Sequence, residues 1–373
     1  MTVYFFYYVL LISFSLFSYA LVNANFPVQF IPALTRFGNE QKALLTGIYV
    51  IQIFLFFIFY LRFLSLAKRK RISKKTIVKV LLTTVIILFI SYPAFSYDIF
   101  NYIATAKITF FYRENPYVLM PIEITGEPML AFMHAANKTA LYGPSWIILT
   151  FFPHVLSFNN LVMAILSFKL FVLFFYLGTC YLIWNFSKKN TYSLLFFALN
   201  PLVLIETLIS AHNDIVMIFF AFFSFYLLSK KRFIFALCAI LISVLIKYAT
   251  IILLPIFAVV FWNSLRNKKT DFSKIFKYAF LGMIFIFLLS PIREEMYPWY
   301  FIWLLAFSAL MEKSNILSTL LIALSLGLEL RFAPFMYFRS WTGIVPQIKK
   351  IVTFAPFLLS LITLFFLRKW QKL

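Results

Sequence analysis

The chain has 373 residues, of which 63% are hydrophobic and only 12% are charged. Soluble globular domains contain about 45–50% apolar and about 25% charged residues, so these proportions exclude a soluble, a fibrous and an intrinsically disordered protein. Apolar stretches recur along the whole sequence, and many approach the roughly 20 residues with which a helix crosses a bilayer. The composition therefore predicts a polytopic membrane protein.

The apolar runs predict an all-α fold, in which residues 1–373 form a single domain, a transmembrane helical bundle of about 11–13 spans. Residues 1–35 contain no lysine or arginine and no evident cleavage site, so the first run is expected to remain as a span and not to be a signal peptide. In chain order the expected spans are Val3–Val22, Ala43–Leu66, Ile77–Phe95, Leu161–Phe186, Tyr192–Ile209, Ile215–Leu228, Phe233–Ile246, Ala249–Trp262, Tyr278–Ser290, Trp299–Met311, Ile316–Leu330 and Ile351–Leu367.

The net charge of +22 is concentrated in alternate connections between these runs. With the N-terminus in the cytoplasm, these connections lie on the cytoplasmic side, as the positive-inside rule requires. They contain only two acids, Asp271 and Glu312, so the charge is interpreted as a topology signal and not as a nucleic-acid-binding surface. The basic clusters are Lys68–Arg71 with Lys74 and Lys75, Lys188–Lys189, Lys230–Arg232, Arg266–Lys277, Lys313, and Arg368–Lys369 with Lys372.

The longest expected connection runs from Ser96 to Asn160 on the opposite, extracytoplasmic side. Its first part, Asp98 to Arg113, has a period of 3.6 residues, which predicts a helix that lies in the membrane interface with its polar face exposed. Pro116 is expected to end that helix. Residues 145–158 are apolar but too short for a full crossing, so they are expected to dip into the membrane and return.

Asp98 stands just outside the third expected span. One interpretation is structural, since the helix dipole stabilises an acid in the first turn of a helix and Ser96 would cap the helix. The other is functional: a carboxylate in a wet cavity at the bilayer surface accepts a proton from an incoming hydroxyl group.

A second polar group follows Pro201, which is expected to disturb the fifth span. Glu206 lies in the outer third of that span and is costly there unless it faces a cavity or a cation. The span ends in His212, Asn213 and Asp214, of which the last two could simply cap the sixth span.

Lys247 and Tyr248 interrupt a long apolar stretch near the outer surface. The lysine either snorkels to the interface or binds a phosphate group, which suits a compact ammonium ion. Arg293 and Trp299 lie on the same side, where a tryptophan could also belong to the aromatic belt of the interface.

The order of these motifs resembles the GT-C superfamily of integral-membrane glycosyltransferases. The similarity is greatest to bacterial polyprenol-phosphate-mannose-dependent α-mannosyltransferases, and it extends over about residues 90–300. One departure is Thr105-Ala106-Lys107, where relatives commonly have a glycine. The motifs are Ser96-Tyr97-Asp98 with Tyr102, Asn115-Pro116-Tyr117, Tyr142-Gly143-Pro144, Asn200-Pro201 with Glu206, Ala211-His212-Asn213-Asp214, Lys247-Tyr248 and Pro298-Trp299-Tyr300.

The resemblance implies an enzyme of the cell membrane that transfers a sugar from a polyprenyl phosphate to a glycan or glycolipid hydroxyl group at the extracytoplasmic face. Mannose follows from the resemblance alone. Asp98 would be the catalytic base and, since one base acts in line, the reaction would invert the anomeric carbon. The residues expected to bind substrate are Tyr102, Asn115, Tyr142, Glu206, His212, Asn213, Asp214, Lys247, Tyr248, Arg293 and Trp299.

No cofactor is indicated. Cys180 and Cys238 lie in apolar runs, and no pair of histidines has metal-binding spacing, although Asp98, His212 and Asp214 could converge on a divalent metal. Alternative functions are a lipid-linked glycan flippase or small-molecule transporter, and a membrane scaffold or a polymerase of another fold. A flippase should carry polar residues through the depth of many spans, whereas here they gather near one face.

Overall fold

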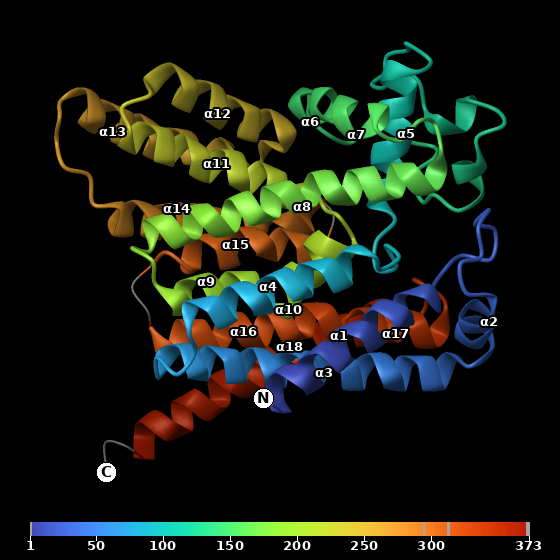
Figure 1. The fold of residues 1–373 in the computed structure, drawn as a ribbon, viewed down its shortest axis with the longest axis horizontal. Helices are drawn as coiled ribbons and strands as arrows, with labels where there is room; N and C mark the ends of the chain where they lie inside the picture. The colour runs from blue at the N-terminus through green and yellow to red at the C-terminus, as the bar shows by residue number, and fades with distance from the viewer. Residues whose placement is uncertain (1, 294, 312–313, 371–373) are drawn as a thin grey trace.

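The protein is a bundle of helices, most of which run in roughly the same direction (Figure 1). The computed structural model describes residues 2–293, 295–311 and 314–370, and these form helices and no strands. The α-helices are α1 (Thr2–Tyr19), α2 (Pro32–Glu40), α3 (Lys42–Lys68), α4 (Lys74–Phe89), α5 (Asp98–Phe110), α6 (Pro144–Leu149), α7 (Phe151–Val155), α8 (Leu161–Phe186), α9 (Thr191–Ala198), α10 (Pro201–Leu204), α11 (Asp214–Ser229), α12 (Phe233–Ile246), α13 (Leu254–Leu265), α14 (Phe272–Arg293), α15 (Phe301–Ser308), α16 (Asn315–Leu330), α17 (Phe332–Phe338) and α18 (Val345–Trp370).

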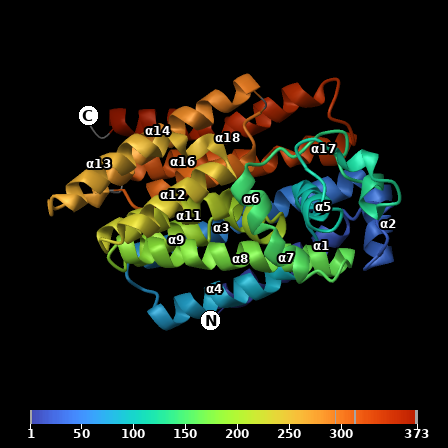
Figure 2. The same cartoon turned by 90° about the horizontal axis from the view of Figure 1, so that it is seen from above.

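Five shorter helical segments complete the fold. The 3₁₀-helices are η1 (Pro121–Glu123), η2 (Pro128–Ala131), η4 (Tyr248–Leu253) and η5 (Pro298–Tyr300), and η3 (Ile205–Ile209) is a π-helix. Seen from above, α4 and α8 lie toward one side of the bundle and α14 and α18 toward the other, with α9 and α11 between them (Figure 2). Helix α11 packs against both α8 and α12, and α16 packs against α18.

Every expected span overlaps a helix or consecutive helices, which confirms an all-α polytopic bundle, although the first and third expected spans run beyond the ends of α1 and α4. Among the described residues, six helices are long and apolar enough to cross a membrane, or up to seven if a bent pair counts as one span. Four further apolar helices have 10–17 residues, so length alone does not yield the expected 11–13 spans. Many large apolar side chains of α3, α8 and α18 are exposed on the outside of the bundle, as lipid-facing surfaces require. The chain is therefore a multi-pass membrane protein.

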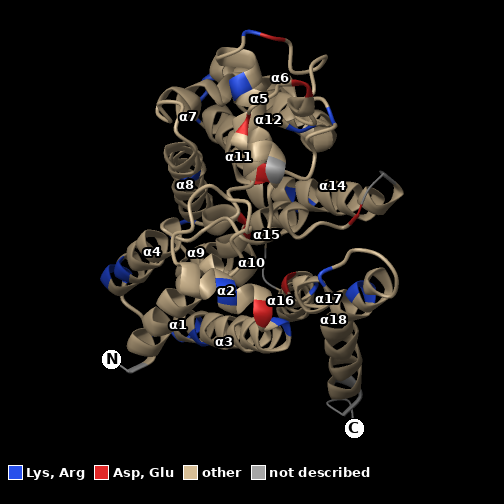
Figure 3. Cartoon of the chain, turned by 90° about the vertical axis from the view of Figure 1, so that its right-hand side faces the viewer, with Lys and Arg blue, Asp and Glu red and all other residues tan. Residues whose placement is uncertain are grey.

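The connections with the basic clusters gather at one end of the bundle. The α3–α4, α8–α9 and α13–α14 turns lie at the left in Figure 1. Contacts join the turns at this end. Lys231, in the α11–α12 turn, donates from Nζ to Asn267 Oδ1 in the α13–α14 turn at 2.5 Å, and Nζ of Lys74, at the start of α4, lies 5.9 Å from the ring centroid of Trp184, near the end of α8. Residues 96–160 lie at the opposite end, where Figure 3 shows acidic residues among the basic ones. The expected division of charge between the two ends is thus present.

The long connection contains α5, η1, η2, α6 and α7. Residues 145–158 form the two short helices α6 and α7 in place of one long helix, in keeping with the expected partial insertion. The expectation for α5 was wrong in one respect. Asn101 and Thr105, on its predicted exposed face, are buried because α5 packs against α6, α7 and α8 and against η1.

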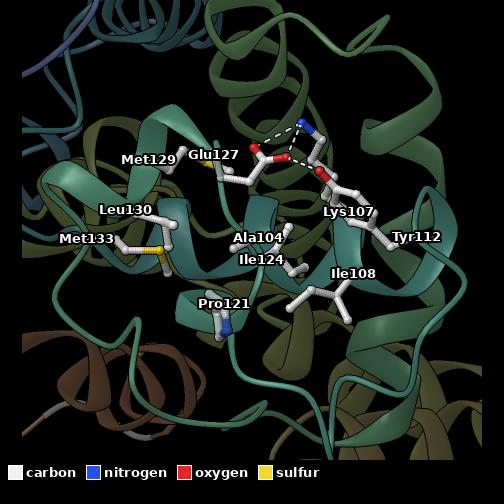
Figure 4. A pocket seen from close by; sticks show the side chains of 10 residues that line it. All are labelled: Ala104, Lys107, Ile108, Tyr112, Pro121, Ile124, Glu127, Met129, Leu130 and Met133. Carbon is white, nitrogen blue, oxygen red and sulfur yellow. Dashed lines mark hydrogen bonds and ion pairs between the residues drawn. The ribbon is translucent and has the colours of Figure 1, made fainter.

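Lys107 secures the fold of this connection (Figure 4). Its ammonium group lies 2.7 Å from Oε1 of Glu127, just before η2, and Tyr112 donates a hydrogen bond to the same oxygen at 2.5 Å. That hydrogen bond raises the pKa of Tyr112 to about 12. The last residue of the segment Thr105-Ala106-Lys107 thus ties α5 to the rest of the connection.

Candidate active site

Three titratable side chains that are far apart in the sequence lie in a row. The imidazole of His212 is buried, with Nδ1 3.6 Å from Oδ2 of Asp98 and Nε2 3.1 Å from Oε2 of Glu206. Neither ring nitrogen is aligned for a hydrogen bond with a described residue. The side chain of Asp98 is 30% exposed, whereas those of His212 and Glu206 are 0% exposed. The row therefore leads from the surface into the bundle.

The break after α9 places Glu206 and His212. Asn200 caps α10 by accepting a hydrogen bond from the Leu202 backbone N–H at 3.0 Å, and Pro201 occupies the first turn of α10, where its missing N–H costs nothing. The segment from Pro201 to Ile209 is bent by 56° from α9. Glu206 lies in the π-helix η3, a form that is frequent at functional sites.

The chain reverses after η3 at Ala211, which has a φ of 57°, in the left-handed region that alanine rarely adopts. The next backbone N–H, that of His212, donates to the carbonyl oxygen of Glu206 at 3.0 Å. This closed turn fixes His212 beside Glu206, and α11 begins two residues later at Asp214.

Aromatic rings fix the plane of the imidazole. Trp299 of η5 stacks on His212 with 4.0 Å between ring centroids and 18° between planes. Tyr297 in turn stacks on Trp299 with 4.4 Å between ring centroids. Trp299 therefore contacts the site directly, in addition to any place in the interfacial belt.

Asp214 forms a separate ion pair beside the row. Both of its carboxylate oxygens accept hydrogen bonds from Lys247 Nζ, at 3.0 and 2.9 Å, and Oδ1 also accepts one from the Trp303 indole at 2.7 Å. The ammonium group of Lys247 lies 4.7 Å from the ring centroid of Tyr300. The Asp214 side chain is 0% exposed and that of Lys247 22%. Asp214 thus neutralises Lys247 at the edge of the site.

Tyr102 and Tyr142 form an aromatic support behind the row. The Tyr102 hydroxyl oxygen accepts a hydrogen bond from the Asn213 backbone N–H at 3.3 Å, and its ring meets those of Tyr142 and Trp146 edge-on. The side chain of Asn213 is buried, and neither its oxygen nor its nitrogen has a described hydrogen-bond partner.

Two expected substrate-binding residues are not brought into this group. Asn115 accepts a hydrogen bond from the Tyr117 backbone N–H at 3.0 Å and so stabilises a local turn. Tyr248 is 59% exposed, and its side chain points away from the buried row. The side chain of Arg293, at the end of α14, lies outside the described residues.

An ion cluster adjoins Tyr297. Glu295 accepts hydrogen bonds from Lys349 at 2.7 and 2.8 Å and from Arg331 at 2.5 Å, and Arg331 also donates to the Met296 carbonyl oxygen. Burial alone would raise the pKa of Glu295, but the hydrogen bond from Lys349 and the charge of Arg331 lower it.

The sequence analysis did not identify Trp303 or Glu329. Trp303 follows Trp299 by four residues, a helical spacing that could have indicated one common face. Glu329, in α16, is fully buried, and its charge interacts with that of Glu206. Nothing in the sequence connects α16 with η3. In the described ranges, no three His, Cys, Asp or Glu side chains could hold a metal ion, and Asp214 faces Lys247 and Trp303.

The arrangement therefore holds a partly exposed carboxylate beside a buried polar interior. Such a carboxylate can accept a proton from a ligand at the surface.

Comparisons with known proteins agree with this chemistry. A family model described as "Alpha-(1->6)-mannopyranosyltransferase, N-terminal domain" matches residues 6–263. The chain is also 27% identical over 225 residues to alpha-(1->6)-mannopyranosyltransferase A of Mycobacterium tuberculosis. That similarity covers 56% of this chain and 42% of the relative, so the chain spans less than half the length of that protein. No solved structure matches the chain significantly.

Proposed function

The chain belongs to the alpha-(1->6)-mannopyranosyltransferase family, and from this premise we propose that it is a glycosyltransferase of the cell membrane. It transfers a sugar, mannose, from a polyprenyl phosphate to a hydroxyl group of a glycan or glycolipid. The curated relative, a mannopyranosyltransferase by name, supports the sugar. The polyprenyl donor rests on the motif resemblance and on the position of the site at one end of a membrane bundle.

The observation that carries the proposal is the difference in exposure among the three acids of the site. Glu206 and Asp214 are 0% exposed, and Asp214 is bonded to Lys247, whereas Asp98 is 30% exposed. Asp98 is therefore the acid of this group that a substrate can reach, and we assign it the role of general base.

The reaction balances with a single base. The acceptor oxygen attacks the anomeric carbon, and its proton passes to the Asp98 carboxylate. The bond between the anomeric carbon and the phosphate oxygen breaks, and the electron pair leaves with the polyprenyl phosphate. Attack opposite the leaving group inverts the anomeric carbon, as in inverting sugar hydrolases that use one base for the nucleophile.

Lys247 is the proposed ligand of the donor phosphate. It is 22% exposed at the edge of the site, and its charge is shared with Asp214. Buried Asp214 holds the ammonium group in place, so the lysine is oriented before the donor arrives.

The site is proposed to face the extracytoplasmic side. The basic clusters lie at the other end of the bundle, and lysine and arginine favour the cytoplasmic side. A lipid-linked donor keeps its chain in the bilayer and its phosphosugar at the surface, which fits a site at the end of the helices.

The test is an assay of purified protein in lipid vesicles with polyprenyl phosphates that carry mannose, glucose, galactose or arabinose, and with an oligomannoside acceptor. A new glycosidic bond formed from the mannosyl donor is expected. Movement of intact donor between leaflets without a new bond would show a carrier and refute the proposal. Transfer from one of the other donors alone would show that the transferred sugar is not mannose.

A further inference from the structure

Glu206 is an acid for which the described part of the chain provides no paired cation. Its side chain is 0% exposed, and neither carboxyl oxygen has a well-aligned hydrogen bond with a described residue, although the Ser210 hydroxyl group lies close enough to favour its ionised form. Lys247 is occupied by Asp214, and Arg331, whose charge reaches Glu206, is bonded to Glu295. A second buried acid, Glu329, lies near enough to interact with it.

Burial of an unpaired carboxylate is costly enough that the group takes up a proton instead. Two neighbouring carboxyl groups in an apolar site strengthen this preference, because like charges disfavour ionisation. A protonated Glu206 has one O–H donor, and Nε2 of His212 lies within hydrogen-bond distance of Oε2, at 3.1 Å.

We propose that Glu206 is a positioning residue that acts in its neutral form: its hydroxyl group donates to Nε2 of His212, which places the histidine proton on Nδ1, toward Asp98. The terminal torsion of a glutamate is soft, so a small rotation of the carboxyl group aligns this hydrogen bond. Trp299 already fixes the plane of the imidazole.

The consequence concerns Asp98. A histidine that carries its proton on Nδ1 directs that proton at Oδ2 of Asp98, 3.6 Å away, and so orients the carboxylate. The Nδ1–H dipole also favours the ionised form of the carboxylate, which keeps Asp98 able to accept a proton at neutral pH. This step rests on the proposed function, because the orientation of Asp98 affects turnover only if that carboxylate is the general base.

The first test reads the tautomer and needs no substrate. The chain has three histidines, so ¹⁵N-histidine labelling gives few signals, and His134→Gln and His154→Gln variants identify those of His212. The nitrogen shifts of a neutral ring protonated on Nδ1 are expected at pH 7. A ring protonated on Nε2, or on both nitrogens, would overturn the proposal.

The second test compares two substitutions of similar size. Glu206→Gln retains a neutral donor for Nε2, so kcat is expected to fall only about threefold, the effect of one altered neutral hydrogen bond. Glu206→Met has no donor, and kcat is expected to fall on the order of 100-fold through misplacement of the base, with little change in the donor KM. Equal losses in both variants would overturn the proposal.

The two tests separate this inference from the proposed function. If no donor sugar is transferred but His212 is protonated on Nδ1, the glycosyltransferase is refuted and the hydrogen-bond arrangement stands. If transfer occurs and the proton lies on Nε2, the glycosyltransferase stands and the proposed role of Glu206 is refuted. Should Glu206→Met fail to fold, the tautomer of the wild-type protein and the Glu206→Gln kinetics still decide.

Discussion

At the residue scale, the acids of the site differ in what surrounds them more than in their chemistry. Asp98 reaches the surface, Asp214 is bonded to a lysine and an indole, and Glu206 faces an imidazole inside the bundle. Each environment suits a different role: a base that exchanges protons, an anchor for a cation, and a neutral hydrogen-bond donor.

Replacement of Asp98 by asparagine tests the base. The amide has the same shape but cannot take the proton, so turnover is expected to fall by about 10²–10⁴-fold. Because Asp98 is 30% exposed, the thermal midpoint should hardly change. Asp271→Asn at the opposite end is the matched control: Asp271 accepts a hydrogen bond from the Ser273 backbone N–H at 3.0 Å, which asparagine preserves. Normal turnover in Asp98→Asn would remove Asp98 from the mechanism.

A test of whether Lys247 binds the donor phosphate requires a double substitution. Lys247→Met leaves buried Asp214 without its cation, which costs about 3 kcal/mol of unfolding free energy, the lower end for a broken buried ion pair. Asp214→Asn with Lys247→Met removes both charges and should recover most of that stability. If the lysine binds the donor phosphate, the double variant still has a raised donor KM. A wild-type donor KM in the double variant would show that Lys247 only neutralises Asp214.

Some residues of the site could be identified from the sequence and others could not, for a physical reason. The sequence indicates Asp98, Glu206 and His212, because polar groups near a membrane core need a partner. Glu329 belongs to α16, more than a hundred residues after η3, and no local pattern reports that two distant helices touch. Lys169, inside the fourth expected span, has a partner that the sequence does not reveal: its ammonium group donates to the carbonyl oxygens of Leu88 and Ser91, at and just after the end of α4.

At the element scale, helix ends were predictable where a side chain marks them. Helix α8 has the expected bounds, Leu161 to Phe186, because Asn160 caps it by accepting hydrogen bonds from the Val162 and Met163 backbone N–H groups. The break at Pro201 was expected, but the π-helix after it depends on tertiary contacts. Helices α2 and α17 were not expected, since each is too short to show a clear period.

Gly143 joins two elements that border the site. Its N–H donates to the Ile246 carbonyl oxygen at 3.1 Å, and a Cβ at this position would lie 2.1 Å from the Leu245 carbonyl oxygen, so α6 must move away from the end of α12. Gly143→Ala is expected to lower the unfolding free energy by about 2 kcal/mol, as overpacking does, and to reduce turnover by displacing Lys247.

Gly47 provides the control for this substitution. It lies within α3, and nothing is within 4 Å of a Cβ added there. Gly47→Ala should stabilise the helix by about 0.5–1 kcal/mol. Thermal unfolding in detergent compares the two variants. If Gly143→Ala is as stable as Gly47→Ala, the contact between α6 and α12 is not tight.

Glu295 links the segment before η5 to α18 and to Arg331. Since its pKa is lower in the folded protein than in the unfolded chain, the ion cluster stabilises the fold above the unfolded pKa. That contribution is lost as the pH falls through the lower, folded value. The thermal midpoint of the wild type should exceed that of Glu295→Gln at pH 7, and the difference should shrink below about pH 4. A difference independent of pH would show that the carboxylate charge does not matter.

At the scale of the whole molecule, two ends of one bundle have different chemistry. One end gathers the basic turns, and the other holds the long connection, the row from Asp98 to Glu206 and the ion pair of Asp214. A transferase that uses a lipid-linked donor needs its chemistry at one membrane surface only. The separation of the ends therefore makes orientation in the membrane part of the mechanism.

Two matched lysines test that orientation. Lys138 lies in the long connection and Lys269 in the α13–α14 turn, and both are exposed. Each is replaced by cysteine in a background in which Cys238, the exposed native cysteine, is alanine. In intact cells, a membrane-impermeant thiol reagent should label Lys138→Cys and not Lys269→Cys, because basic turns remain in the cytoplasm.

Permeabilised cells supply the control, since both cysteines should then be labelled to the same extent. Loss of one lysine from the basic end leaves the other clusters intact, so the substitution itself should not invert the protein. Labelling of Lys269→Cys alone in intact cells would place Asp98 in the cytoplasm. The sugar donor would then have to present its phosphosugar at the inner leaflet, and the proposed extracytoplasmic acceptor would be excluded.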